Sequence, residues 1–163
     1  MLPKPKLKEG FTIAELLIAL AITGILLAAV AAAFNASIEN YSVNEDIFNT
    51  TNSARQALSR ITSQLRTAEA VDPNGPNSQC ALITAEGDNI TYRYNSDDGK
   101  LYLDNTAGSY VLCENVTAMT FTKDTATEGS ITYVKSVKIL ITVTSGDVER
   151  KVSAAAVIRR NLD

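Results

Sequence analysis

The 163-residue sequence contains no histidine and no tryptophan, and it has only two cysteines. Without histidine there is no Ser-His-Asp triad, no histidine general base and almost no zinc site of the kind that enzymes use. Two cysteines alone are too few ligands for a structural zinc ion. We therefore expect no catalytic residue, no bound metal, no cofactor and no enzymatic activity.

An excess of basic residues is also missing. Fifteen lysines and arginines stand against eighteen aspartates and glutamates, which gives a net charge of −3. Nucleic-acid binding requires a basic surface that neutralises phosphates. The basic dipeptides Arg150-Lys151 and Arg159-Arg160 are isolated pairs, and we expect them to face solvent at strand edges. Direct binding of nucleic acid is therefore not expected.

No proline lies between Phe11 and Asp72. Because an internal proline breaks or kinks a helix, this range is open to one long helix. The helix is expected to be less regular over Asn35–Asn52, where Asn, Ser and Thr are dense. Its second half carries a narrow apolar stripe with alternating steps of four and three, typical of a helix that packs on a sheet or on another helix. The stripe consists of Ile47, Thr51, Ala54, Leu58, Ile61, Leu65 and Ala68.

The first half of this helix is a 24-residue apolar run, Phe11–Phe34. At 1.5 Å per residue it would extend about 36 Å, enough to cross a hydrocarbon core of about 30 Å. Three lysines precede the run and no basic residue follows it until Arg55. This asymmetry predicts a cytoplasmic N-terminus and an extracytoplasmic C-terminal part. The run contains one acid, Glu15, and an ionisable residue in a membrane-length segment is a functional hypothesis because its burial is costly.

Two ordinary interpretations of this segment compete. A secretory signal peptide, cleaved among Ala29–Ala33, would leave a chain that starts near Phe34 or Asn35, but its apolar core is usually only about 7–15 residues long. A plain signal anchor would tether an extracytoplasmic binding domain, and Glu15 would then be incidental. A buried helix of a soluble protein is disfavoured because the run is apolar on every face.

The segment Lys8-Glu9-Gly10-Phe11-Thr12-Ile13-Ala14-Glu15, followed by Leu16–Leu20, resembles the N-terminus of type IV prepilins and type II secretion pseudopilins. Glycine stands before a phenylalanine, and glutamate is the fifth residue from that phenylalanine. The resemblance covers residues 1–34. It implies that a prepilin peptidase cleaves between Gly10 and Phe11 and N-methylates Phe11.

The resemblance also implies an organisation and a set of partners. Residues 1–10 would be the leader peptide, residues 11–34 the transmembrane and filament-core helix, and residues 35–163 a periplasmic or extracellular domain. The chain would be a structural subunit, a minor pilin or pseudopilin, of a type IV pilus or type II secretion filament. Its partners would be other pilins or pseudopilins, the peptidase, an inner-membrane assembly platform and, before assembly, membrane lipid.

Glu15 has a specific expected role within this family. A carboxylate among packed apolar helices needs a partner, because its uncompensated desolvation costs several kcal/mol. In pilins the partner is the N-terminal ammonium of a neighbouring subunit, here that of Phe11, and the pair sets the register between helices. The alternative is a carboxylate hydrated at the lipid headgroups, which would hold before assembly.

Beyond Asp72-Pro73 the sequence predicts short antiparallel strands and hence an α+β fold, as in pilins. Strands are expected at residues 81–84, 89–95, 100–104, 110–112, 116–121, 136–144 and 148–159. Asp97 and Asp98 could bind calcium, but their Asp-Asp-Gly sequence is more typical of a hairpin turn. The strand at 116–121, the late hairpin and residues 158–162 resemble J-type pseudopilins and W-type minor pilins.

Cys80 and Cys113 are the two cysteines. If the domain lies outside the cytoplasm, a disulfide between them is expected. A bridge that spans 33 positions would contribute roughly 3–4 kcal/mol in the loop-entropy model. The alternative is two buried free thiols.

Overall fold

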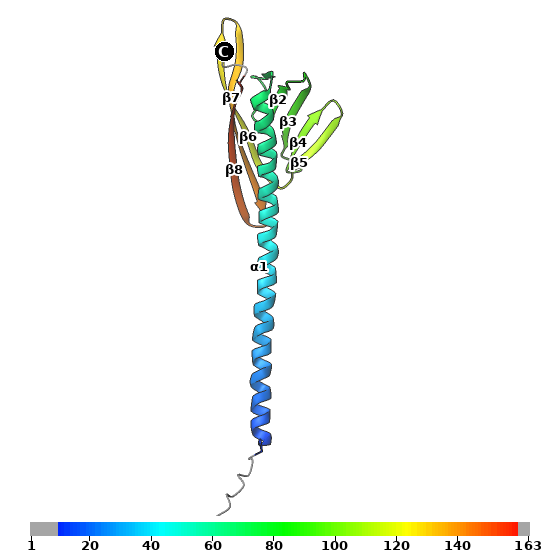
Figure 1. The fold of residues 1–163 in the computed structure, drawn as a ribbon, viewed down its shortest axis with the longest axis vertical. Coiled ribbons are helices and arrows are strands. Elements are labelled where there is room, and N and C mark those ends of the chain that lie inside the picture. Colours follow the sequence, from blue (N-terminus) through cyan, green and yellow to red (C-terminus); the bar gives the residue numbers. More distant parts are fainter. Residues whose placement is uncertain (1–9, 160–163) are drawn as a thin grey trace, which may run out of the picture. The chain divides into compact units, whose positions relative to one another are not determined.

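The computed structural model describes residues 10–159. Its elements are one helix, α1 (Ile13–Thr67), followed by eight antiparallel strands, which is the predicted α+β class (Figure 1). The chain divides into two compact units, Met1–Ser42 and Val43–Asp163, and α1 contributes to both. The helix is continuous through the Asn-, Ser- and Thr-rich stretch where we expected less regularity, and it ends at Thr67, before the predicted end at Asp72.

In the first unit, every described residue from Gly10 to Ser42 is exposed to solvent. An apolar helix without any covered face has no packing energy within its own chain, because burial of apolar surface is the main stabilising term in folding. Its Leu, Ile and Val side chains therefore require lipid or other helices around them.

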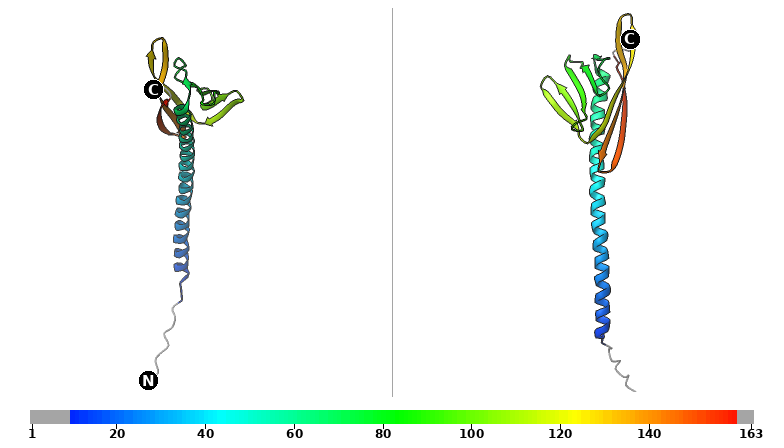
Figure 2. Two further views of the ribbon diagram at one scale, coloured as in Figure 1. Left: turned by 45° about the horizontal axis from the view of Figure 1, so that its top comes forward. Right: turned by 180° about the vertical axis from the view of Figure 1, so that it is seen from behind.

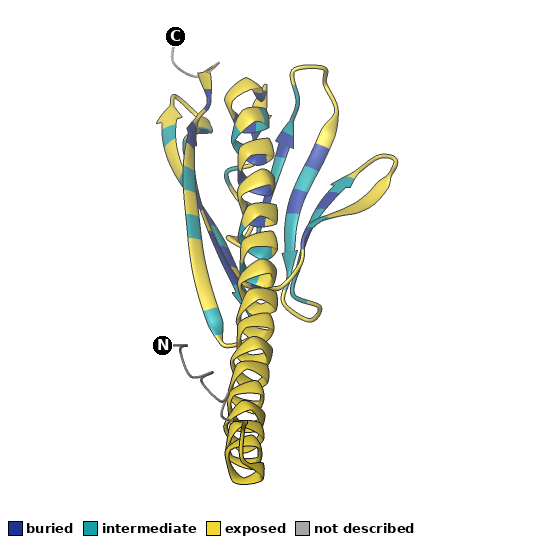
Figure 3. Ribbon diagram, turned by 60° about the horizontal axis from the view of Figure 1, so that its bottom comes forward, coloured by how far each residue is buried: buried dark blue, intermediate teal, exposed yellow. Residues whose placement is uncertain are grey.

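In the second unit, the predicted stripe of α1 forms part of the hydrophobic core. Ala54, Leu58, Ile61 and Leu65 are buried, and Ala57 joins them. Ile47 and Thr51, at the start of the stripe, are half-buried. Figure 3 shows buried residues only on the C-terminal part of α1, beside the strands. The stripe prediction is confirmed, and it fixes which face of the helix the strands cover.

The first sheet contains five strands in sequential order. They are β1 (Ala70–Val71), β2 (Gln79–Ile83), β3 (Asn89–Asn95), β4 (Lys100–Asn105) and β5 (Gly108–Cys113). Alternate residues face the core: Leu82 is paired with Ile90, and Tyr92 with Leu103. A bulge at Leu101/Tyr102 interrupts the β4–β5 register. The very short β1 was not predicted.

The second sheet contains β6 (Val116–Glu128), β7 (Ile131–Ser145) and β8 (Val148–Val157), in that order. The predicted alternation in β7 is confirmed, because Val137, Ile139, Ile141 and Val143 are all buried. β6 and β7 are longer than predicted, and they pair as far as Glu128 and Ile131. On β6 this outer end consists mainly of threonines and charged residues, so the apolar alternation that marks a strand is absent there.

The two sheets lie on either side of the C-terminal part of α1 (Figures 1 and 2). The loop after β1 joins them: the Phe121 N–H donates to the Asn77 carbonyl at 2.8 Å, and Lys123 Nζ donates to the Gly75 carbonyl at 2.9 Å. Asn74 N–H donates to Asp72 Oδ1 at 2.9 Å, which shapes the start of the loop. The segment after Asp72, where the helix was predicted to have ended, is thus a loop that is hydrogen-bonded to β6.

Candidate processing and assembly site

The N-terminus of α1 is closed by a reciprocal pair of hydrogen bonds between Thr12 and Glu15. The Glu15 N–H donates to Thr12 Oγ1 at 3.2 Å, and Glu15 Oε2 accepts from the Thr12 N–H at 2.9 Å. Thr12 Oγ1 also donates to Glu15 Oε2 at 2.9 Å. This is a capping box, in which the residue before the helix and the third helical residue satisfy each other's backbone N–H groups.

The capping box fixes where the helix begins relative to the predicted cleavage point. The first helical backbone bond runs from the Leu16 N–H to the Thr12 carbonyl, at 3.2 Å. Gly10, Phe11 and Thr12 lie outside the helix, and the Phe11 side chain is 87% exposed. The Gly10–Phe11 peptide bond therefore precedes the helix, in a segment without regular secondary structure.

Thr12 is the residue that the sequence prediction missed. The Thr-x-x-Glu spacing before an apolar run is itself a signal for a capping box. The interpretation of Glu15 as a lone acid in a membrane segment left out its local partner. In this structure the Glu15 carboxylate is already engaged within its own chain.

The helix that carries Glu15 is long and apolar enough to cross a membrane. An 18-residue window of α1 has a mean hydropathy of 2.7, and none of that window is buried. Within the described residues, α1 is the one helix with this property. The leader lysines Lys4, Lys6 and Lys8 lie outside the described residues.

Cys80 and Cys113 are both buried free thiols, so the predicted disulfide is wrong and the alternative of two buried thiols holds. Cys80 lies in β2 and Cys113 in β5, with β3 and β4 between them. At about 4.8 Å per strand, three steps across the sheet make about 14 Å. A disulfide requires Cα atoms within about 7 Å.

Burial explains the chemistry of these thiols. Removal from water raises the pKa of Cys80 to about 11, a nearby Lys123 opposes the rise, and burial likewise raises the pKa of Cys113 to about 11. A thiol is nucleophilic as its thiolate. Both side chains are therefore inert near neutral pH.

Asp97 and Asp98 form the predicted hairpin turn. Asp98 Oδ2 accepts from the Tyr102 hydroxyl at 2.6 Å, and this bond lowers the Asp98 pKa. Asp98 Oδ1 accepts from the Lys100 N–H at 3.2 Å. Across residues 10–159, no group of three or more His, Cys, Asp or Glu side chains gathers as a metal site.

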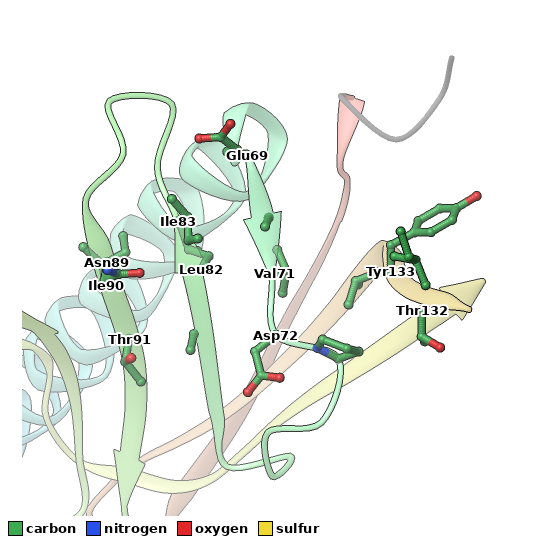
Figure 4. A pocket seen from close by; sticks show the side chains of 15 residues that line it. Glu69, Val71, Asp72, Leu82, Ile83, Asn89, Ile90, Thr91, Thr132 and Tyr133 are labelled. Atoms are coloured by element: carbon green, nitrogen blue, oxygen red, sulfur yellow. The ribbon is translucent and has the colours of Figure 1, made fainter. Parts of the chain in front are cut away.

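A groove of about 590 Å³ lies beside β1, β2, β3 and the start of β7 (Figure 4). Its apolar lining includes Val71, Leu82 and Ile90, and its carboxylates are Glu69 and Asp72. None of the predicted site residues lines it. The lining does not contain a cysteine or a lysine that could act as a nucleophile.

Comparison with protein families found a match at the N-terminus. The prokaryotic N-terminal methylation motif matches residues 5–31, which include Gly10, Phe11, Thr12 and Glu15. No curated protein and no solved structure matched the chain. The motif accounts for the N-terminal segment and leaves the J-type and W-type resemblance as a prediction. At its N-terminus, therefore, the chain carries the methylation motif that is typical of type IV pilin-like precursors.

Proposed function

We propose that this chain is a structural subunit, a minor pilin or pseudopilin, of a type IV pilus or type II secretion filament. A prepilin peptidase removes residues 1–10 on the cytoplasmic side and N-methylates Phe11. The apolar helix then leaves the membrane and joins a bundle of equivalent helices, while the sheet-bearing domain stays outside the cytoplasm. The subunit does no chemistry of its own.

The observation that carries this proposal is the methylation motif at residues 5–31, which from Ile13 onward lies on a helix whose residues up to Ser42 are all exposed. Two further features support it. The bond to be cleaved precedes the capped helix, so cleavage does not require a helical turn to unwind. The exposed apolar surface of the helix needs a bundle or a bilayer to cover it.

Glu15 has two successive partners in this proposal. In the precursor its carboxylate caps α1 by accepting from Thr12. After cleavage, the new ammonium at Phe11 of a neighbouring subunit offers it a charged partner. A buried ion pair is weak as a source of stability but well suited to setting register, so we assign Glu15 to registry in the assembled filament.

The first test is the N-terminal sequence and intact mass of the protein from its native membrane, with and without the prepilin peptidase. The expected mature chain lacks Met1–Gly10, starts at Phe11 and carries one added methyl group. A chain that keeps Met1 would support the signal-anchor alternative. One that starts near Asn35 would indicate a secretory signal peptide, and either result would end the filament proposal.

A pair of substitutions separates the capping role of Glu15 from its charge. Glu15→Gln keeps a capping acceptor, since Glu and Gln both serve at this position, but it cannot form an ion pair. Glu15→Ala removes both. We expect both variants to insert into the membrane and both to be incorporated into filaments less well. If the ion pair between Glu15 and the Phe11 ammonium contributes about 1.4 kcal/mol, incorporation should fall about tenfold.

Incorporation is measured as the share of each variant recovered in sheared or purified filaments. If Glu15→Gln assembles normally and Glu15→Ala does not, the residue acts through the helix cap and the registry assignment is wrong. Normal assembly of both variants would remove any role for Glu15 in assembly.

A further inference from the structure

The two sheets of the second unit carry opposite net charge. The segment that forms the first sheet, residues 70–115, contains seven acidic and two basic residues, a net charge of −5. The segment that forms the second sheet, residues 116–159, contains six basic and four acidic residues, a net charge of +2. One copy of the domain therefore presents an acidic sheet and a basic sheet on the two sides of the same helix.

Each sheet also ends in an open edge strand. In the described residues, β5 pairs only with β4, and β8 pairs only with β7. In antiparallel ladders every second residue of an edge strand directs its N–H and C=O groups away from its partner. Such an edge is a template for another strand.

Apart from the bulge where it pairs with Leu101 and Tyr102, the β5 edge lacks the usual protection. Native edges are commonly blocked by charged side chains, proline or a covering element. β5, with the sequence Gly-Ser-Tyr-Val-Leu-Cys, contains no charge and no proline. Its Tyr110 and Val111 side chains are 50% and 46% exposed. The acids Asp104 and Glu114 stand in the neighbouring strand and just after β5.

The β8 edge carries basic residues, where acidic residues stand beside β5, and it has an uncharged stretch of the same length as β5. It carries Arg150 and Lys151 in its first half, and Lys151 pairs with Glu149 at 3.1 Å. Its last six residues, Val152–Val157, are all small or apolar, and Val157 is 47% exposed. This uncharged stretch is six residues long, the same as β5.

We propose that β5 of one copy adds to β8 of a second copy, so that the acidic sheet of one subunit continues into the basic sheet of the next. Strand addition gives affinity through main-chain hydrogen bonds. The opposite net charges of the two sheets favour this pairing over β5 with β5, which would bring two acidic sheets together. The inference rests on the proposed filament function only for the presence of many copies side by side.

The symmetry of the contact fits an open assembly. A surface that meets a different surface on the next copy is heterologous, and heterologous contacts build helical filaments when the rotation does not close. Helix bundling would bring the domains together, and the edge contact would then set the order of neighbouring domains around the filament.

Thiol cross-linking in cells tests the contact. Two differently tagged full-length copies are co-expressed, one with Ser109→Cys on β5 and one with Ala155→Cys on β8. Both positions are exposed. The native cysteines provide a silent background because both are buried. We expect a cross-link between the two tags, and little between two copies that both carry Ser109→Cys or both carry Ala155→Cys.

A matched pair of substitutions tests the edge itself. Val111→Lys places a charge on β5, the device that natural edges use against pairing, and it should lower the cross-link yield about fivefold, equivalent to about 1 kcal/mol. Ile131→Lys makes the same change at a 69% exposed position at the start of β7. That control should leave the yield unchanged. High salt should reduce the yield, because screening weakens attraction between exposed charges.

A third probe separates this inference from the filament proposal. Ala28→Cys lies on the apolar helix and reports contact between helices. A cross-link at Ala28 without one between Ser109 and Ala155 would overturn the edge contact and leave the filament proposal standing. A cross-link between two copies that both carry Ser109→Cys would also overturn it, in favour of a β5–β5 pair. Loss of the Ala28 cross-link itself would count against the filament.

Discussion

At the scale of single residues, the outer face of the first sheet holds a compact charge network. Arg93 Nε donates to Asp104 Oδ2 at 2.8 Å, and the Arg93 guanidinium lies 4.9 Å from the centre of the Tyr102 ring. The Ser109 hydroxyl also bonds to Asp104. These contacts link β3, β4 and β5 on the side away from the helix, so they brace the strand whose free edge we assign to subunit contact.

Asp104→Asn tests how much this network contributes. The hydrogen bond from Arg93 holds the Asp104 pKa below its usual range. Because the folded-state pKa is lowered, the stabilisation is present above the unfolded pKa of about 3.9 and is lost as pH falls through the folded value. We expect Asp104→Asn to lower the free energy of unfolding by roughly 0.5 kcal/mol at pH 7, a value reduced for solvent screening.

The measurement is urea unfolding of the full chain in detergent at pH 7 and again near pH 3. The difference from the unmodified protein should shrink at the lower pH. Asp97→Asn is the matched control, since Asp97 is exposed in the adjacent turn and makes no ion pair within residues 10–159. An equal loss of stability in both variants, or a difference that stays constant with pH, would contradict a role for the Arg93 pair.

At the scale of elements, helices and strands could be predicted from the sequence where apolar residues recur with helical or strand periodicity. The stripe from Ala54 to Leu65 follows helical periodicity, and it is buried as expected. The strand Asn89–Asn95 was predicted with its observed bounds, because alternating side chains and a turn signal define it. The outer part of the β6–β7 hairpin was missed because its threonines and charges show no apolar alternation, and pairing with the opposite strand determines its structure.

The candidate site also contains residues that were predicted from the sequence and one that was missed. Gly10, Phe11 and Glu15 were predicted from the resemblance to prepilins, whereas the role of Thr12 appears only in the geometry of the helix start. Its capping spacing was nevertheless present in the sequence. The cysteine pairing could not be predicted, because the strands expected between Cys80 and Cys113 did not reveal their order in the sheet, which places β3 and β4 between the two thiols.

At the scale of the whole molecule, the two units have different requirements. The described residues of the second unit, 43–159, bury one core formed by the helix stripe and both sheets. The apolar part of α1 in the first unit is exposed in isolation and depends on lipid or other helices. Contacts of the apolar helix with lipid or other helices are therefore separable from contacts made by the sheets, and substitutions in β5 or β8 should not alter membrane insertion.

The buried thiols report whether the second unit unfolds as one piece. Cys80 and Cys113 are in the same core but in strands at different positions of the sheet. If the unit opens cooperatively, both thiols should react with a maleimide at one common rate. Near pH 7 that rate should be at least about a hundredfold below the rate in denaturant, since opening that costs roughly 3 kcal/mol reduces the reactive population by that factor.

Raising the pH from about 8.5 to about 11 should weaken the protection of the two thiols against the maleimide. Burial raises the pKa of both thiols to about 11, above the unfolded value of about 8.5. A group with a raised folded-state pKa stabilises the fold fully below its unfolded pKa, and that contribution is lost as pH rises through the folded value. Cys80→Ser and Cys113→Ser, measured singly by mass spectrometry of labelled peptides, assign each reaction. Fast labelling of Cys113 alone in the folded protein would show that β5 opens separately, and the edge we assign to subunit contact would then be the least stable strand of its sheet.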